Sequence, residues 1–307
     1  MSLKLTDPDY RKPSSTKKPI MVLGATLFVI VMLLTYHCNR ALTNESLGIR
    51  LYTNNIRYDN KNLTPGEKPW ALRGPLVAQS IVDNTADGPA VVCLQEVLHN
   101  QLEDILAFLN KDNSDWSYYG IGRTDGLEKG EFAPILYKKS EWTLESSRTY
   151  WLSETPEKPS VGWDAALERI VTEVILSHKR NGEEIKVLNT HFDHKGVIAR
   201  RELVKLILSK MESGNQPLFL CGDLNTQPTD EPYAILKSTE YKDSRTYQDN
   251  PDENEPTFTG FNEADGTGII DYIWADPKSK WQAYHVLPNH FGFYMSDHRP
   301  VVADYTF

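Results

Sequence analysis

Apolar and polar residues alternate with a period of two in several segments of this chain, and this pattern predicts β-strands. Residues 90–94 instead form a continuous apolar run, which is typical of a strand buried on both faces. The dipeptide Asn181-Gly182 separates two alternating segments and predicts a hairpin. The predicted strands are 48–58, 89–97, 133–138, 142–150, 169–177, 184–192, 217–221, 269–275 and 300–305.

Apolar residues recur every three to four positions in other segments, which predicts amphipathic helices. The expected helices are 72–82, 102–109 and 196–211. Strands outnumber helices, and the two kinds are mixed along the whole chain. Because no repeat or linker interrupts residues 48–307, we expect one α/β domain in which polar motifs meet at strand ends.

A segment near the N-terminus has a different character. Residues 19–38 contain no Asp, Glu, Lys or Arg, and a bilayer span needs about 20 mostly apolar residues. Basic residues are concentrated before this segment, so the positive-inside rule places the N-terminus in the cytosol. We expect a cytosolic tail at 1–18, a transmembrane signal anchor at 19–38, a stem at 39–47 and a catalytic body at 48–307.

This topology predicts a single-pass type II membrane protein whose body lies in the secretory-pathway lumen or outside the cell. Glycosylation sequons at Asn44 and Asn62 fit that exposure. A cleaved signal peptide is the first alternative, although no good small-residue cleavage site follows the apolar core. A mitochondrial membrane is the second, although Asp7 and Asp9 are unusual in a transit peptide, which is poor in acids.

Net charge limits the partners of the body. The whole chain has a net charge of -9, and residues 41–307 hold 27 Lys and Arg against 40 Asp and Glu, a net charge of -13. Such a body has no general electrostatic attraction for nucleic acid or anionic lipid. A phosphate ligand must therefore be bound locally, by a metal and a few basic side chains.

Three cysteines are too few for a disulfide framework. Cys93 and Cys221 lie inside apolar strand-like runs, so we expect both to be small buried residues. Counted with a period of two, Cys93 points away from the Glu96 face whereas Cys221 shares the Asp223 face. We therefore expect the two thiols on opposite sides of a sheet, without a bond between them.

Polar residues with metal and acid–base chemistry follow the apolar runs. Glu96 comes directly after the run 90–94, and a buried carboxylate there must be paired or metal-bound. Asp223 and Asn225 follow 217–221 and share a face, so they can hold one water or one phosphoryl oxygen. Taken alone, Glu96 is as consistent with a strand exit facing water, and Asp223 with an ordinary turn.

Histidines supply the proton chemistry. Asp297 and His298 are adjacent and should point apart, with Asp297 toward a metal and His298 toward the nucleophile or phosphate. Asp271 is placed to hold the tautomer of His298. Asn189 and His191 share a face of the strand 184–192. Taken alone, Asp297-His298 could be a surface turn, and His191 could be a hydrogen-bonded histidine of the core. The sequence around His99 and His194 carries no motif, so we expect these two histidines at the surface.

Other catalytic motifs are missing from the sequence. No Cys/His cluster has zinc spacing, no Gly-x-Ser-x-Gly elbow is present and no Walker phosphate-binding loop is present.

The motifs taken together, in their order along the chain, resemble those of the endonuclease/exonuclease/phosphatase superfamily. They are Asn55-Ile56-Arg57, Leu94-Gln95-Glu96-Val97, Asn189-Thr190-His191, Gly222-Asp223-Leu224-Asn225, Ile270-Asp271-Tyr272 and Ser296-Asp297-His298-Arg299-Pro300. Segments around residues 126–131 and 151–166 are similar to those of a largely uncharacterised microbial branch. The resemblance covers residues 48–307 and implies a four-layer α/β/β/α sandwich of two mixed sheets.

The resemblance also implies roles for individual residues. Glu96 and Asp297 would bind the metal with Asn55 nearby, and Mg²⁺ fits such an oxygen site, with Mn²⁺ fitting nearly as well. His298 held by Asp271 would be the base or a transition-state partner, and Asp223 and Asn225 would position water or the leaving oxygen. His191, paired with Glu131, would stabilise phosphoryl oxygens or protonate the leaving group. The expected substrate contacts are Arg57, Glu131, Arg169 and Asn189.

We therefore expect a metal-dependent hydrolase that acts on phosphoester bonds. A nuclease-like phosphodiesterase is the first hypothesis, and a lipid, sugar or inositol phosphate hydrolase is the alternative. A catalytically silent phosphate-binding protein on the same fold is the alternative from another class. The membrane is an expected partner through residues 19–38, nothing indicates a protein partner, and a monomer is expected.

Overall fold

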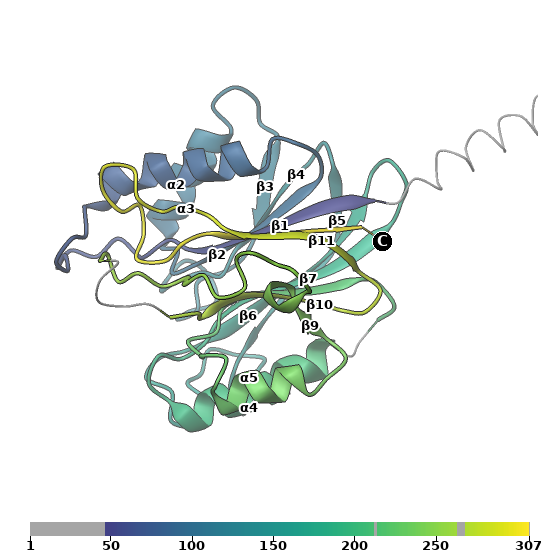
Figure 1. The fold of residues 1–307 in the computed structure, drawn as a ribbon. Helices are drawn as coiled ribbons and strands as arrows, with labels where there is room; N and C mark the ends of the chain where they lie inside the picture. The colour runs from purple at the N-terminus through teal and green to yellow at the C-terminus, as the bar shows by residue number, and fades with distance from the viewer. Residues whose placement is uncertain (1–46, 212–213, 263–267, 307) are drawn as a thin grey trace, which may run out of the picture. The chain divides into compact units, whose positions relative to one another are not determined.

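The computed structural model describes residues 47–211, 214–262 and 268–306 and is drawn in Figure 1. The expected anchor at 19–38 and almost all of the stem lie outside the described residues. Within the described part of the chain, no helix combines the length and apolar character needed to span a membrane.

Two six-stranded sheets, each mixed in direction, form the centre of the described structure. In spatial order, the first sheet contains β11 (Lys280–Val286), β12 (Val301–Thr306), β1 (Gly48–Asn55), β2 (Ala90–Gln95), β4 (Ile135–Lys138) and β3 (Trp116–Tyr119). The second contains β5 (Trp142–Trp151), β6 (Ile170–His178), β7 (Glu184–His191), β8 (Leu218–Asp223), β10 (Asp271–Ala275) and β9 (Lys242–Asp243).

Helices cover the outer faces of the two sheets. They are α2 (Trp70–Asn84) and α3 (His99–Leu109) on the first sheet, and α4 (Val197–Met211) and α5 (Glu231–Lys237) on the second. A short 3-10 helix, η1 (Ser244–Thr246), follows β9. The three predicted helices are confirmed, whereas α5 and η1 are additional because each is too short to show a helical period.

Three apolar layers hold this arrangement together. One lies between the sheets and contains Val91, Phe219 and Ile273. The second packs α2 and α3 on the first sheet, and the third packs α4 and α5 on the second. Burial between layers is the main stabilising term in such a fold. The result is the α/β sandwich of two mixed sheets with flanking helices that the motifs implied.

Each sheet contains one parallel pair of strands joined through a helix. In the first sheet α2 connects β1 to β2, and Asn55 is level with Gln95 at their carboxyl ends. In the second sheet α4 connects β7 to β8, and His191 is level with Asp223. Because parallel strands joined in this way end at the same edge, polar residues that follow them are collected there.

The two cysteines are buried as expected, but their placement relative to each other differs from the expected one. Cys93 in β2 and Cys221 in β8 belong to the same apolar layer, the one between the sheets, and both are free thiols. The expected placement on opposite sides was wrong because it treated both strands as members of one sheet. With two stacked sheets, the inner faces of both strands point into the same core.

Candidate active site

Tight turns after the strands set the directions of the site residues. Arg57, Glu96 and Asn225 all have positive φ, at 57°, 57° and 43°. Such a conformation costs about 1–3 kcal/mol for a residue other than glycine, and it concentrates at functional sites. Gly222, with φ 144°, has to be glycine, because a Cβ atom there would lie 2.0 Å from the carbonyl oxygen of Thr190.

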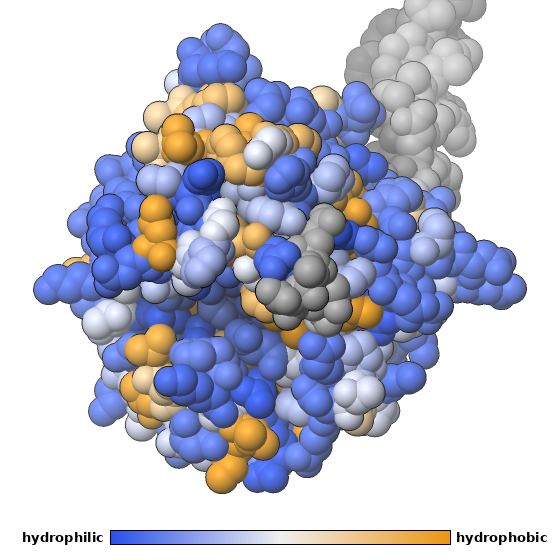
Figure 2. All heavy atoms as spheres, turned by 60° about the vertical axis from the view of Figure 1, so that its left-hand side comes forward, coloured by the Kyte–Doolittle hydropathy of each residue, from blue (hydrophilic) through white to orange (hydrophobic). Residues whose placement is uncertain are grey.

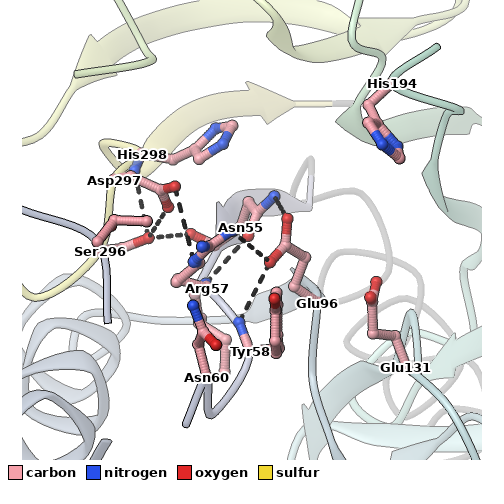
Figure 3. A network of polar contacts seen from close by, with 12 residues as sticks. Asn55, Arg57, Tyr58, Asn60, Glu96, Glu131, His194, Ser296, Asp297 and His298 are labelled. Atoms are coloured by element: carbon pink, nitrogen blue, oxygen red, sulfur yellow. Dashed lines mark hydrogen bonds and ion pairs between the residues drawn. The ribbon is translucent and has the colours of Figure 1, made fainter. Parts of the chain in front are cut away.

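The edge where these strands end faces the reader in Figure 2. Its surface is largely hydrophilic and is hollowed near the middle. A close view of the polar residues at this edge is given in Figure 3.

Asn55 joins the two sheets at this edge. Its Nδ2 atom donates to Glu96 Oε1 at 3.0 Å and to Asp223 Oδ2 at 3.0 Å, and its Oδ1 atom accepts from the backbone N–H of Arg57 at 3.0 Å. The Asn55 side chain is fully buried. One amide therefore fixes the positions of two carboxylates that come from different sheets.

Glu96 and Asp297 share one basic neighbour. The Arg57 guanidinium lies 3.9 Å from Glu96 Oε2 and 4.0 Å from Asp297 Oδ2, and the three lie together in Figure 3. Burial raises the pKa of Asp297 to about 6, and the negative charge of Glu96 adds to this rise while His298 and Arg57 oppose it. Two carboxylates against one guanidinium leave excess negative charge, which a divalent cation would offset.

A second group contains Asp223, Asp271 and His298. His298 Nδ1 lies 2.9 Å from Asp271 Oδ2, and His298 Nε2 lies 3.7 Å from Asp223 Oδ2. Each residue offers one ligand atom, and these atoms all lie within 4.8 Å of one another, so the group is a possible metal site. Asp271 Oδ1 is buried and has no hydrogen-bond partner among the described residues.

The charge of His298 follows from its neighbours. Burial lowers its pKa, but the negative charges of Asp271 and Asp223 outweigh burial and raise the pKa to about 10. With its pKa raised in this way the imidazole carries a hydrogen on both nitrogens at neutral pH, and Nδ1 donates to Asp271.

His191 is neutral, in contrast to His298. Burial lowers its pKa to about 3, and the positive charge of Arg169 adds to the effect. Asn225 Nδ2 lies 3.1 Å from His191 Nε2, so Nε2 accepts and the ring hydrogen is on Nδ1. His191 Nδ1 faces Glu131 Oε2 at 3.5 Å, and Nε2 lies 3.5 Å from Asp223 Oδ2. His191 and Glu131 thus face each other, but neither His191 Nδ1 nor Glu131 Oε2 has a hydrogen-bond partner among the described residues.

Several polar residues near His191 belong to no strong sequence motif. Arg169 Nε contacts Asp193 Oδ2 at 3.3 Å, and Arg169 Nη2 contacts His194 Nδ1 at 3.0 Å. Arg123, which the motifs do not mark, pairs with Glu131 at 2.8 Å. His194 was expected at the surface and is exposed, but Figure 3 shows it facing the site. Its position three residues after His191 was the available signal.

Asn189 lies apart from the other expected substrate contacts. It is fully buried between the sheets, where its Nδ2 atom donates to the carbonyl oxygens of Leu94 and Pro134, both at 2.8 Å. Its Oδ1 atom accepts from Gln95 Nε2 at 2.7 Å. These bonds use the whole amide, so we assign Asn189 to holding the sheets together rather than to substrate.

Comparisons with known proteins agree with this geometry. A model of the Endonuclease/Exonuclease/phosphatase family matches residues 55–298 of the chain. The chain belongs to this family. The matched range begins at Asn55 and ends at His298, so it includes every site residue described above.

Solved structures of family members have the same fold. An endonuclease/exonuclease/phosphatase family protein from Bacteroides thetaiotaomicron is 31% identical, with a TM-score of 0.76 over 86% of this chain and 99% of that chain. The mannosyl-6-phosphatase of Bacteroides thetaiotaomicron VPI-5482 is 30% identical, with a TM-score of 0.73 over 84% of this chain and 100% of that one. These bacterial members agree with the microbial branch expected from the motifs.

The curated relatives match this chain over only part of their own length. Nocturnin of Drosophila melanogaster is 28% identical over 183 residues, which cover 54% of this chain and 26% of that protein. The chain covers between 26% and 59% of the lengths of the first curated relatives that it matches.

Proposed function

We propose that this chain is a metal-dependent phosphoesterase that hydrolyses a phosphate ester by attack of an activated water. The observation that carries the proposal is the convergence of Glu96, Asp223 and His298 on one edge, with Asn55 bonded to both carboxylates. Family membership supports hydrolysis of a phosphoester in general terms.

Asp223 is the group we assign to the attacking water. Its Oδ2 atom is 3.0 Å from Asn55 Nδ2 and 3.5 Å from His191 Nε2, and its Oδ1 atom accepts the Asn225 N–H at 2.8 Å. In the proposed step the water oxygen bonds to phosphorus, the bond from phosphorus to the leaving oxygen breaks, and Asp223 accepts a proton from the water.

The two histidines take different roles in this scheme. His298 is protonated and anchored by Asp271, so it donates to a phosphoryl oxygen as negative charge develops there. A base role for His298 is disfavoured, because a protonated imidazole has no lone pair to accept a proton. His191 is neutral and has no acidic proton to give, so in this scheme it accepts from Asn225, and the leaving oxygen takes its proton from solvent water.

Glu96 and Asp297, with Asn55 beside them, are the residues we assign to the metal. Their donors are all oxygen, which suits Mg²⁺, and Mn²⁺ fits nearly as well. The cation, when bound, polarises a phosphoryl oxygen and offsets charge on the leaving oxygen. The group of Asp223, Asp271 and His298 would be a second position for a cation only with His298 neutral, which is not its state in this scheme.

Small phosphate esters are the substrate class we favour, and a sugar phosphate is the leading example. The support is the 30% identity to a mannosyl-6-phosphatase whose whole chain is covered. The acidic body argues against nucleic acid, because such a body repels the phosphate backbone. A nuclease-like phosphodiesterase is the second candidate, since the family includes both activities by its description.

Hydrolysis by the full-length protein, purified in mild detergent, tests the proposal. The panel would contain mannose 6-phosphate, glucose 6-phosphate, an inositol phosphate, a sphingomyelin-like diester, RNA and single-stranded DNA, each with Mg²⁺, Mn²⁺ or EDTA. We expect release of phosphate from a sugar phosphate with metal and none with EDTA or in His298→Ala. Metal binding without turnover of any substrate would instead favour the phosphate-binding alternative.

We also propose that residues 19–38 anchor the protein with its body in the secretory-pathway lumen or outside the cell. The support is the uncharged apolar segment with basic residues before it. Protease protection of the body in intact microsomes tests this, because a cytosolic body would be digested.

A further inference from the structure

A fully buried arginine on α2 bonds to the backbone around the proposed metal site. The side chain of Arg73 has no exposed surface. A guanidinium carries five N–H groups, and here each of them has an acceptor, so the donor capacity of Arg73 is used completely. The five acceptors are the backbone carbonyl oxygens of Ile56 at 2.7 Å, Lys68 at 2.8 Å, Met295 at 2.9 Å, Arg57 at 3.1 Å and Tyr58 at 3.3 Å.

Four of these acceptors lie in the two segments that lead into the metal site. Three belong to the turn 56–58, which directly follows β1. The fourth belongs to Met295, in the segment 295–298 that carries Asp297. The two segments are far apart in the sequence, and one Arg73 side chain is bonded to both. It therefore holds them at a fixed position relative to each other.

The turn uses its N–H groups on the metal site and its carbonyl groups on Arg73. The backbone N–H of Arg57 donates to Asn55 Oδ1 at 3.0 Å. The backbone N–H of Tyr58 donates to Glu96 Oε2 at 3.2 Å, a bond drawn in Figure 3. A positive φ at Arg57 is a strained conformation, which persists only when the surrounding structure stabilises it. The bonds from Arg73 supply that stabilisation.

Glu67 balances the charge of Arg73 and connects it to Arg57. The side chain of Glu67 is fully buried, and its Oε1 atom lies 3.9 Å from Arg73 Nη2 and 3.5 Å from Arg57 Nε. A buried charge needs such a partner, because leaving it alone in a dry interior is costly. Arg57 in turn faces Glu96 and Asp297. The buried pair therefore also orients the basic side chain that the two carboxylates share.

We propose that Arg73 is a positioning residue for the metal site. By fixing the turn 56–58 and the segment 295–298 together, it sets the separation of the Glu96 and Asp297 carboxylates. The proposal rests on the proposed function, which assigns these two carboxylates to the metal. Arg73 acts through the backbone rather than by touching the cation. Loss of a group that orients metal ligands typically weakens metal binding about 10–100-fold.

Mn²⁺ binding to the full-length protein in mild detergent, without substrate, tests this role. Electron paramagnetic resonance measures free Mn²⁺ and so gives Kd without any turnover. Arg73→Lys keeps the positive charge but has three N–H donors in place of five. We expect Kd for Mn²⁺ to rise about 10–100-fold with the circular dichroism spectrum retained. A wild-type Kd in Arg73→Lys would overturn the proposal.

Ile81→Ala is the matched control for a loss of stability alone. Ile81 is fully buried on the same helix, eight residues or about 12 Å beyond Arg73, and it packs in the apolar layer under the first sheet. Its truncation should lower Tm, because it leaves a cavity in that layer, while Kd for Mn²⁺ stays within about twofold of wild type. A rise in Kd as large as that in Arg73→Lys would contradict the proposal, since any weakening of α2 would then suffice.

Trp70→Phe provides a milder variant if Arg73→Lys does not fold. The Trp70 ring lies 5.5 Å from the Arg73 guanidinium and confines it. A smaller ring confines it less, so we expect Kd for Mn²⁺ to rise about threefold. A wild-type Kd in this variant would count against the role of Arg73.

This role and the proposed reaction fail in different measurements. Mn²⁺ binding that is weakened in Arg73→Lys, without hydrolysis of any ester by the wild type, would keep the role of Arg73 and remove the reaction. Metal-dependent hydrolysis by the wild type, with an unchanged Kd for Mn²⁺ in Arg73→Lys, would do the reverse.

Discussion

The side-chain amide of Asn55 lies 3.0 Å from Asp223 Oδ2, which links the last residue of β1 in one sheet to the last residue of β8 in the other. The same amide nitrogen lies 3.0 Å from Glu96 Oε1. One amide donor therefore sets the distance between Glu96, which is assigned to the metal, and Asp223, which is assigned to the attacking water. Neither sheet alone could build this arrangement.

Replacing Asn55 should damage catalysis more than folding. We expect Asn55→Ala to lower kcat by about 10²–10³-fold, as loss of one well-placed donor does, with the circular dichroism spectrum unchanged. Asn55→Asp should be at least as damaging, because it adds a carboxylate next to Glu96 and Asp223. Asn84→Ala, at the end of α2, is the matched control and should keep wild-type kcat. Wild-type kcat in Asn55→Ala would contradict the assigned role.

The His298–Asp271 pair predicts a loss of stability in alkali. Contact with Asp271 and Asp223 outweighs burial and raises the pKa of His298 from 6.5 to about 10. A raised pKa means that the folded state binds the proton more tightly than the unfolded state. The stabilisation is therefore complete below pH 6.5 and is lost as the pH rises toward 10.

Thermal unfolding of the metal-free protein in EDTA measures this effect. Between pH 6.5 and 10, Tm of the wild type should fall more steeply than Tm of His298→Gln, which cannot titrate. His290→Gln, at an exposed histidine that forms no ion pair with the described residues, provides the control slope. Parallel slopes for wild type and His298→Gln would show that the pair does not have the proposed charge.

Local patterns were sufficient to predict most elements and the catalytic edge. The run 90–94 and the alternation before Asn55 mark β2 and β1, and polar residues directly after them lie at the site. The end of a strand can be predicted because it depends on residues that are neighbours in the sequence. Two parallel strands that are joined through a helix also end at the same edge of the sheet. The sandwich of two sheets came from the family resemblance.

Contacts between the sheets could not be predicted in the same way. A period of two shows that Cys93 and Asn189 point inward or outward, but not which strand faces them. Cys93 thus shares an apolar layer with Cys221, and the side-chain amide of Asn189 donates to the carbonyl oxygens of Leu94 and Pro134. The contact between His194 and Arg169 could not be predicted either, because the two residues are 25 positions apart in the chain.

Asn189 should contribute to stability rather than to substrate binding. Asn189→Leu leaves the carbonyl oxygens of Leu94 and Pro134 without their donor, and we expect a loss of about 2–4 kcal/mol in the free energy of unfolding. Chemical denaturation measures it, and KM of the folded variant should stay within about threefold of wild type. A double-mutant cycle with Gln95→Leu should show coupling, because the two amides share a 2.7 Å bond. A large rise in KM at unchanged stability would restore a substrate role.

Asn62 offers a test of the compartment. The Asn62-Leu63-Thr64 sequon is exposed in the structure, so the fold does not block an oligosaccharide there. If the body enters the lumen, expression in eukaryotic cells should give a protein whose mobility increases on endoglycosidase treatment. Asn62→Gln should remove part of this shift, and Asn62→Gln with Asn44→Gln should remove all of it. A wild-type protein without any shift would argue for a body outside the secretory pathway.

Asp193 predicts a loss of stability in acid. Burial acts to raise its pKa, but the backbone N–H groups of Gly196, Lys195 and Ala166, with the charge of Arg169, hold the pKa below its ordinary value of 3.8. A lowered pKa means that the unfolded state binds the proton more tightly, so the stabilisation is present above pH 3.8 and is lost as the pH falls below it.

Asp193→Asn removes that carboxylate and leaves Arg169 buried without its partner. We expect a loss of about 3 kcal/mol in the free energy of unfolding at pH 7, as for other broken buried pairs. The difference from wild type should shrink as the pH falls from 4 toward 2, because the unfolded wild-type chain then binds a proton at Asp193 that the folded state binds only weakly. Asp83→Asn, at an exposed position on α2, should differ little from wild type at any pH. A difference that stays constant down to pH 2 would mean that Asp193 acts through shape and hydrogen bonding rather than through its charge.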